Sequence, residues 1–333
     1  MKVARPPITA FFAEINPKWL MLICIFWLAF EFVILGKYSF VVTGDNLTGL
    51  IPGAIAPKFA GIANPAWNHL SSSGGDRLST NPIGQLNYIL FTHLPSWLAY
   101  QINILSQIIL GFLGVYFLTR RAFNISPSAA IFSAFLFASG VHGQLHVASI
   151  FLTPFLILAT SLVLTDKRSL LRWGLLAGSS ILVGETAWLA ELLPFSASVV
   201  LTWFVFVERP RSINDWGIVL IAVATPIMLR IPDIIVGMHY STLSHRSLVT
   251  ILPTWGRSLD VLLSYLTRPT SILAEVLLLL ALTTRRPMPS YLYSLGIGLI
   301  LWIFALLLLA PIQALVVDLI PSLRGYVFSR FAN

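Results

Sequence analysis

One acidic residue stands where it could do chemistry, just after the first long apolar segment of this 333-residue chain. Asp45 follows the apolar segment 19–36, and Gly44 precedes it. A carboxylate just outside a membrane helix can act as a general base toward an acceptor hydroxyl, and a glycine lets backbone or substrate approach closely. The same pair also suits an Asx turn or a helix N-cap. Both interpretations stay open from the spacing alone.

The segment after Asp45 is rich in Gly, Pro, Asn and Ser and holds three candidate substrate-binding residues, Trp67, Asn68 and Asp76. Trp67 suits stacking on a sugar face, and equally the aromatic belt at a membrane interface. Asp76 is adjacent to Arg77, so the pair is either solvated or has one member facing a site.

A second group of residues could bind a phosphate. Guanidinium groups bind phosphate bidentately, and the candidates are Arg230, Arg246, Arg257 and Arg268. Their alternative role is to reach lipid headgroups. Glu185 is the best candidate for a second catalytic acid, because it lies at the outer end of a predicted helix.

Two further sets of residues have both a functional and a structural interpretation. His142 and His146 are four residues apart, a spacing that suits a shared metal on a helix but also suits interfacial polar residues. His146 alternatively lines a donor pocket. Glu31 and Glu275 lie within predicted spans, where a carboxyl group is costly and is therefore a functional candidate.

The elements that position these residues must be membrane helices. Hydrophobic residues make up 57% of the chain and charged residues 10%, which excludes both a soluble globule and a disordered chain. A single cysteine excludes a disulfide scaffold and a cysteine-based metal site. The net charge of +8 is dispersed among apolar segments, so it does not indicate nucleic-acid binding.

Apolar segments long enough to be spans predict an all-α, polytopic bundle of about nine transmembrane helices with a long first outer loop. The spans are 19–36, 98–119, 128–142, 147–164, 173–187, 192–207, 216–230, 271–284 and 291–310. We predict one integral membrane domain over 1–333, with outer loops at 37–97 and 231–270 and an outer C-terminal segment at 311–333. The spans 173–187 and 192–207 are separated by few residues. Either they form a tight hairpin, or one of them is re-entrant.

Basic residues predict the orientation. Of the 21 Lys and Arg residues, 12 fall in short loops that the order of spans places on one side. They are Lys2, Arg5, Lys18, Arg120, Arg121, Lys167, Arg168, Arg172, Arg209, Arg211, Arg285 and Arg286. The positive-inside rule makes this side, with the N-terminus, cytoplasmic. These loops are too short for a nucleotide-binding domain, and no phosphate-binding or dinucleotide-binding glycine string occurs.

An ordered set of motifs resembles a known family. The set comprises Gly44-Asp45, Pro65-x-Trp67-Asn68, Gly74-Gly75, Asn81-Pro82, a helix ending in Arg120-Arg121, the segment 128–140, His146, and a faint return over 321–331. In this order the chain resembles the YfhO-like family of bacterial multi-spanning proteins in the GT-C glycosyltransferase superfamily. The similarity is clearest over 40–150.

The resemblance implies a bacterial inner-membrane enzyme that moves a sugar from a polyprenyl-phosphate donor to an envelope lipid or polymer acceptor on the outer face. Asp45 matches the superfamily's first-loop acidic residue at the catalytic centre. A single Asp replaces the usual acidic pair, so no cofactor is assigned and a divalent metal stays an open alternative. Similar proteins continue into further helices beyond a point equivalent to Asn333.

The sequence leaves two rival functions open. One is a transporter or flippase for a lipid-linked or anionic solute, which would use Glu31, Glu275 and the outer arginines. The other is a non-catalytic membrane assembly subunit. In either case membrane lipids surround the chain.

Overall fold

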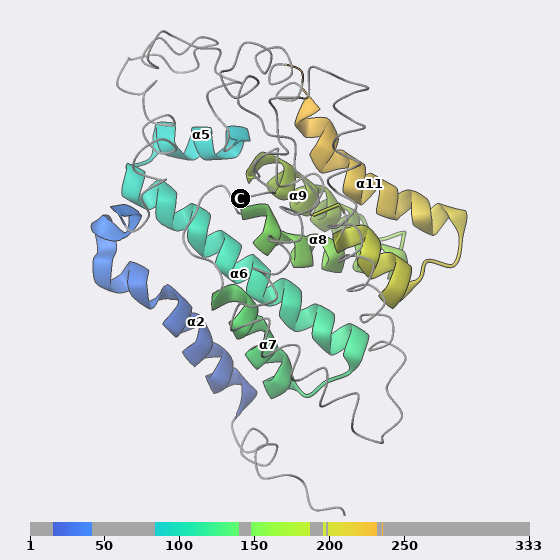
Figure 1. The fold of residues 1–333 in the computed structure, drawn as a ribbon, viewed down its shortest axis with the longest axis horizontal. Helices are drawn as coiled ribbons and strands as arrows, with labels where there is room; N and C mark the ends of the chain where they lie inside the picture. The colour runs from blue at the N-terminus through green and yellow to red at the C-terminus, as the bar shows by residue number, and fades with distance from the viewer. Residues whose placement is uncertain are drawn as a thin grey trace, which may run out of the picture. The chain divides into compact units, whose positions relative to one another are not determined.

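The described part of the chain is entirely helical. The computed structural model describes residues 16–41, 84–139, 148–186, 196–197, 199–231 and 235, and no strand occurs among them (Figure 1). The elements are α2 (Pro17–Leu35), η1 (Gly36–Val41), α5 (Gly84–His93), α6 (Ser96–Phe123), α7 (Pro127–Ser139), α8 (Ala148–Thr165), α9 (Leu170–Thr186), η4 (Phe204–Glu208) and α11 (Ile213–Leu229). The chain divides into two compact units, Met1–Phe204 with Pro210–Pro232, and Val205–Arg209 with Asp233–Asn333. Apart from most of η4, these elements belong to the first unit.

The helices match the apolar segments of the sequence. The spans predicted at 19–36, 98–119, 128–142, 147–164, 173–187 and 216–230 correspond to α2, α6, α7, α8, α9 and α11. The span at 192–207 is helical where it is described, and the spans at 271–284 and 291–310 lie outside the described residues. The all-α prediction is confirmed for the described part, and the count of nine spans stays a prediction.

Two of the described helices are long and apolar enough to cross a membrane, Pro17–Tyr38 and Ser96–Phe123. By length and composition they indicate a membrane association. The segment 37–97, predicted as a loop, includes the described residues of η1 and the ten-residue helix α5. Hydropathy missed α5, because ten residues that include Gln85, Asn87 and His93 do not form an apolar run of membrane length.

Local sequence sets both ends of α2. The Asn16 side chain accepts a hydrogen bond from the Lys18 backbone N–H at 3.0 Å, and Pro17 occupies the first turn, where its missing N–H costs nothing. At the other end Gly36 has a φ of +49°, a conformation that favours glycine, and its N–H donates to the Phe32 carbonyl. The helix therefore ends where η1 begins.

α6 is the central helix, with α2 and α7 packed on one side and α8 on another (Figure 1). Gln101, near the start of α6, donates to the Gly36 carbonyl oxygen at 2.7 Å, so the end of α2 lies beside the start of α6. Apolar side chains between α2, α6 and α7 form one core, which includes Phe32, Tyr100, Ile104 and Ile131.

Two glycines let α6 approach α8 closely. A Cβ on Gly111 would lie 2.7 Å from the Phe151 carbonyl oxygen, and one on Gly114 would lie 2.6 Å from the Phe155 nitrogen. These are backbone atoms, which cannot move aside as a flexible side chain could. The contact falls where Pro154 interrupts the hydrogen-bonding pattern of α8. Small residues at a helix crossing of this kind are typical of membrane bundles.

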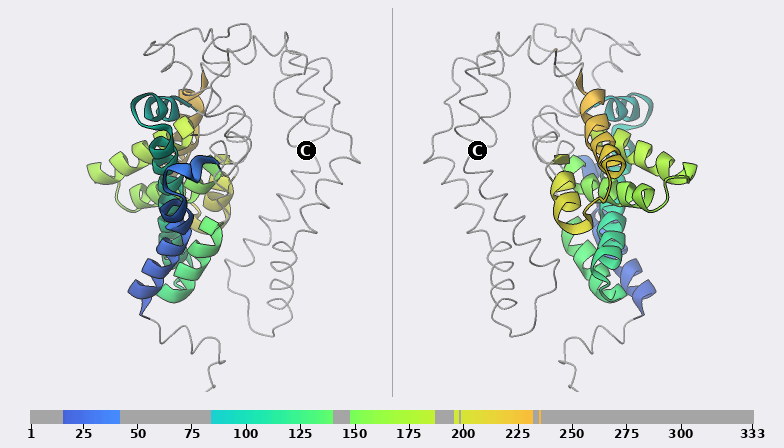
Figure 2. Two further views of the ribbon diagram at one scale, coloured as in Figure 1. Left: turned by 90° about the vertical axis from the view of Figure 1, so that its left-hand side faces the viewer. Right: turned by 90° about the vertical axis from the view of Figure 1, so that its right-hand side faces the viewer.

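A second close approach joins α9 to α11. A Cβ on Gly184 would lie 3.1 Å from both the Pro226 Cα and the Leu229 Cδ1. Leu156, Val183, Val200 and Val219 contribute to the core that α8, α9 and α11 share. Figure 2 shows α8 and α9, in light green, projecting to one side of α2 and α6.

The α6–α8 contact gives a stability prediction. Replacing Gly114 with Ala forces the two backbones apart, so we expect a loss of about 1–3 kcal/mol, the usual cost of overpacking. The matched control is Gly174→Ala in α9, where no atom lies within 4 Å of the added Cβ and the change should be neutral or stabilising. Thermal unfolding of both purified variants in the same detergent measures the difference. Equal midpoints would contradict the close approach.

Candidate functional site

Polar contacts fix the two ends of α6. Gln101 donates to the Gly36 carbonyl at one end, and Arg121 at the other donates to the Ser161 carbonyl at 3.2 Å and to the Thr165 hydroxyl. Gln101 and Arg121 are twenty positions apart, which is about 30 Å of α-helix. This length equals the hydrocarbon thickness of a typical bilayer. We name the first end, where α2, α9 and α11 finish and α6 begins, the η1 end.

The opposite end, formed by the end of α6, the α8–α9 turn and the start of α11, we name the basic end. Its charged side chains are Arg120, Arg121, Asp166, Lys167, Arg168, Arg172, Arg211 and Asp215. Three of the loops that the sequence placed on one side of the membrane, those with Arg121, Lys167 and Arg211, thus meet at one end of the bundle. Which side of a membrane this end faces stays a prediction.

Two predicted site residues lie at neighbouring helix ends at the η1 end. Glu185 follows Gly184, and Arg230 follows Leu229, so the α9–α11 contact brings them to neighbouring helix ends. Arg230 is buried, with 2% of its surface exposed, and Glu185 is partly buried. The Arg230 backbone N–H donates to the Ile227 carbonyl at 3.0 Å, which holds this residue at the helix terminus. A carboxyl group and a guanidinium so placed offer a proton acceptor and an anion ligand.

The other predicted site residues lie outside the described residues. They are Asp45, Trp67, Asn68, Asp76, His146, Arg246, Arg257 and Arg268. The first described segment ends at Val41, the last residue of η1, which is four positions before Asp45. Four residues reach at most about 14 Å. The length of the connecting chain therefore keeps Asp45 within about 14 Å of Val41.

The carboxyl residue of α2 does not pack against the other described helices. Glu31 is exposed on the outer surface of α2, and Glu275 lies outside the described residues. A transport pathway needs its carboxyl groups toward the interior or a water-filled cavity. The placement of Glu31 therefore gives no support to the transporter alternative.

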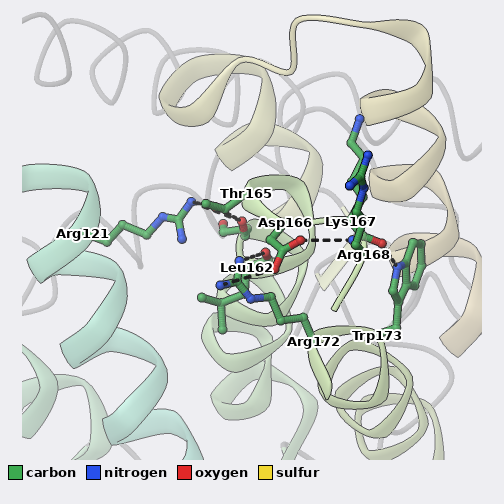
Figure 3. A network of polar contacts seen from close by, with 9 residues as sticks. Arg121, Leu162, Thr165, Asp166, Lys167, Arg168, Arg172 and Trp173 are labelled. Atoms are coloured by element: carbon green, nitrogen blue, oxygen red, sulfur yellow. Dashed lines mark hydrogen bonds and ion pairs between the residues drawn. The ribbon is translucent and has the colours of Figure 1, made fainter. Parts of the chain in front are cut away.

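Two arginines close the end of α8 at the basic end (Figure 3). The carbonyls of the last turns of a helix carry partial negative charge, which favours cationic side chains beside them. Arg172 donates to the Leu162 carbonyl at 3.0 Å, and Arg121 reaches the Ser161 carbonyl from α6. Arg172 also lies 3.9 Å from an Asp166 carboxylate oxygen. These contacts tie α6, α8 and α9 together.

An ion pair joins the α8–α9 turn to α11. The Lys167 ammonium lies 2.5 Å from an Asp215 carboxylate oxygen, while Ser212 and Asp215 form a reciprocal capping box at the start of α11. Trp173 donates its indole N–H to the Lys167 carbonyl at 2.9 Å. The hydrogen bond from Lys167, followed by those with Ser212, holds the pKa of Asp215 below its ordinary value of 3.8.

The structure also contains buried polar side chains that the sequence reasoning missed. Gln107 donates to the Asn103 side-chain oxygen one turn earlier in α6, and the Thr153 hydroxyl donates to the Ser196 hydroxyl at 2.9 Å. All four side chains are buried. The i, i+4 spacing of Asn103 and Gln107 in an otherwise apolar helix was the available signal. A hydrogen bond between helices, such as that from Thr153 to Ser196, contributes about 0.6 kcal/mol in membranes.

The described residues contain a small apolar crevice but no metal cluster. The crevice, of about 10 Å³, lies among Leu156, Val183, Val200 and Ala222 and has room for one water molecule. No group of three or more His, Cys, Asp or Glu side chains gathers in the described part of the chain. Among the predicted site residues, only Glu185 and Arg230 therefore lie in the described part of the chain.

Comparison of the chain with protein-family profiles, with curated proteins and with solved structures found no match. The resemblance to YfhO-like proteins stays a prediction from the sequence motifs.

The Lys167–Asp215 pair predicts a pH-dependent stability. Because its pKa is lower in the folded state, Asp215 stabilises the fold fully above the unfolded pKa of about 3.8, and this contribution is lost as the pH falls through the folded pKa. We expect Asp215→Asn to lower the thermal midpoint at pH 7 and to approach wild type below pH 4. Thermal scans from pH 7 to pH 3 measure this. Asp166→Asn, which removes only a 3.9 Å contact, is the control. A constant Asp215→Asn deficit at every pH would contradict the assignment.

Proposed function

We propose that the chain is a multi-pass membrane glycosyltransferase of the GT-C type in the bacterial inner membrane, with its N-terminus in the cytoplasm. It would move a sugar from a polyprenyl-phosphate donor to an envelope lipid or polymer acceptor on the outer face. The single observation that carries the proposal is the separation of the two ends of α6. The η1 end holds Glu185, Arg230 and the exit toward Asp45, whereas the opposite end holds the basic cluster.

Membrane insertion is supported by the surface of α2. Its outward side chains include Trp19, Ile23, Trp27, Val33 and Ile34, each more than 60% exposed. A continuous apolar face of this kind is unfavourable in water and favourable against lipid chains. The distance of about 30 Å between the polar ends of α6 matches one bilayer core.

The orientation follows from charge. The basic end carries the arginines and lysines that the positive-inside rule retains in the cytoplasm. The η1 end then faces outward, where lipid-linked sugars are used by this superfamily. The donor carries its own energy in the sugar–phosphate bond, so the absence of a nucleotide-binding string in the sequence agrees with the proposal.

The proposed reaction is a direct displacement. Asp45 accepts the proton of the acceptor hydroxyl as the oxygen of that hydroxyl attacks the anomeric carbon. The bond from that carbon to the phosphate oxygen breaks, and polyprenyl phosphate leaves with the electron pair. Arg230, or an arginine of 231–270, binds the phosphate and stabilises its growing charge. Glu185 is the second acidic group, and the sugar configuration inverts.

The proposal predicts that Asp45→Asn abolishes transfer, because the amide cannot accept the proton. The assay incubates purified protein with radiolabelled polyprenyl-phosphate sugar and an envelope lipid fraction as acceptor, and loss of at least 100-fold is expected, a typical contribution of general base catalysis being about 10²–10⁴. The control Asp166→Asn makes the same change at the basic end and should keep full activity. Wild-type rates for Asp45→Asn would remove Asp45 from the mechanism. Absence of turnover by wild type, with solute counterflow in vesicles, would favour the transporter instead.

A further inference from the structure

Part of the basic end combines exposed cations with exposed apolar side chains. At the α8–α9 turn, Leu170 and Leu171 are 86% and 76% exposed, and at the start of α11 Ile213 is 87% exposed. Arg168 and Arg211, also exposed, flank these residues in the sequence. The Lys167–Asp215 ion pair joins the two segments, so these side chains belong to one surface. We name Lys167, Arg168, Leu170, Leu171, Arg211 and Ile213 the turn surface.

The carboxylates of this region are already engaged. Asp215 pairs with Lys167, and Asp166 lies beside Arg172 and accepts a hydrogen bond from the Arg168 backbone N–H at 3.1 Å. Neither the Arg168 nor the Arg211 guanidinium contacts a carboxylate among the described residues. Two cationic groups are thus left for an external anion.

The apolar side chains indicate what carries that anion. Leu170, Leu171 and Ile213 would each be costly in water, and each lies within three residues of an arginine. Trp173 and Trp216 are partly buried in the first turns of α9 and α11, where tryptophan marks a membrane interface. An acidic soluble protein would match the charges but not this combination of interfacial tryptophans and protruding leucines. A phospholipid supplies both an anionic phosphate and acyl chains.

We infer that the turn surface binds the headgroup of an anionic phospholipid, with Arg168 and Arg211 on its phosphate and Leu170, Leu171 and Ile213 against its acyl chains. Guanidinium groups bind phosphate oxygens bidentately, and a basic residue near an anionic membrane surface favours binding about fivefold. The Lys167–Asp215 pair and the Trp173–Lys167 hydrogen bond hold the turn in place. The turn therefore loses little conformational entropy when the lipid binds. The inference rests on the membrane insertion in the proposed function, but not on glycosyl transfer.

The test titrates the purified full chain in detergent with phosphatidylglycerol or with phosphatidylcholine and measures bound lipid by native mass spectrometry. Wild type should bind phosphatidylglycerol more tightly. The double variant Arg168→Gln/Arg211→Gln should lose about fivefold in phosphatidylglycerol affinity for each arginine, with phosphatidylcholine binding unchanged. The charge-retaining Arg168→Lys/Arg211→Lys should keep most of the preference, and its native elution and helicity would show that both positions tolerate change.

Lys37→Gln is the matched control, because Lys37 is an exposed cation beside Gly36 at the η1 end. It should bind both lipids as wild type does. Equal affinity of wild type for the two lipids would overturn the inference, and so would an unchanged preference in the double Gln variant or the same loss in Lys37→Gln. The readout needs no sugar donor, so it can succeed where transfer fails. If the chain were recovered in the soluble fraction before detergent extraction, this would instead overturn membrane insertion, on which both the lipid-binding inference and the proposed function rest.

Discussion

In the membrane setting that we propose, hydrocarbon offers no hydrogen-bond partner, and this constraint would account for where the polar side chains of the described bundle lie. Gln101 and Arg121 each bond to backbone carbonyls, and they are separated by about the thickness of a bilayer core. Between them on α6, Gln107 donates to Asn103 within the same helix. Apart from Glu31 within α2, the charged residues of the described helices lie at or near helix ends, where they create two chemically different surfaces.

The proposed lipid environment would also change how the helices are held together. Lipid chains are as apolar as leucine, so burial of leucine gives little drive for helices to associate, and close backbone packing takes its place. Gly111 and Gly114 provide that packing against α8, and Gly184 provides it against α11. The last contact also has a chemical consequence. It fixes the ends of α9 and α11 side by side, and these ends carry Glu185 and Arg230.

The sequence predicted the features that depend on composition along the chain. Apolar runs located α2, α6, α7, α8, α9 and α11, and basic loops predicted which helix ends lie together. It could not predict α5, which is short and mixed in polarity. It also could not predict the Thr153–Ser196 hydrogen bond, because partners 43 residues apart are matched only by the packing of the helices.

The candidate site, too, was predictable from the sequence only in part. Glu185 and Arg230 were selected separately, one as an acid and one as a phosphate ligand, and their proximity depends on Gly184, whose role in packing no local pattern revealed. The partners of Lys167 and Arg172 likewise come from other segments of the fold. Residue types therefore indicated the chemistry, while the tertiary contacts decided which groups share an end.

The central claim is that the chain leaves the bundle toward Asp45 on the face opposite the basic end. Cysteine labelling tests it directly, because the chain has one native cysteine, the buried Cys24, which can be replaced by Ala. Asn46→Cys and Ser169→Cys then report the two faces to a membrane-impermeant maleimide. The account predicts that residue 46 is labelled in intact bacterial cells and residue 169 only after permeabilisation. Labelling of both from the same side, or the reverse pattern, would contradict it.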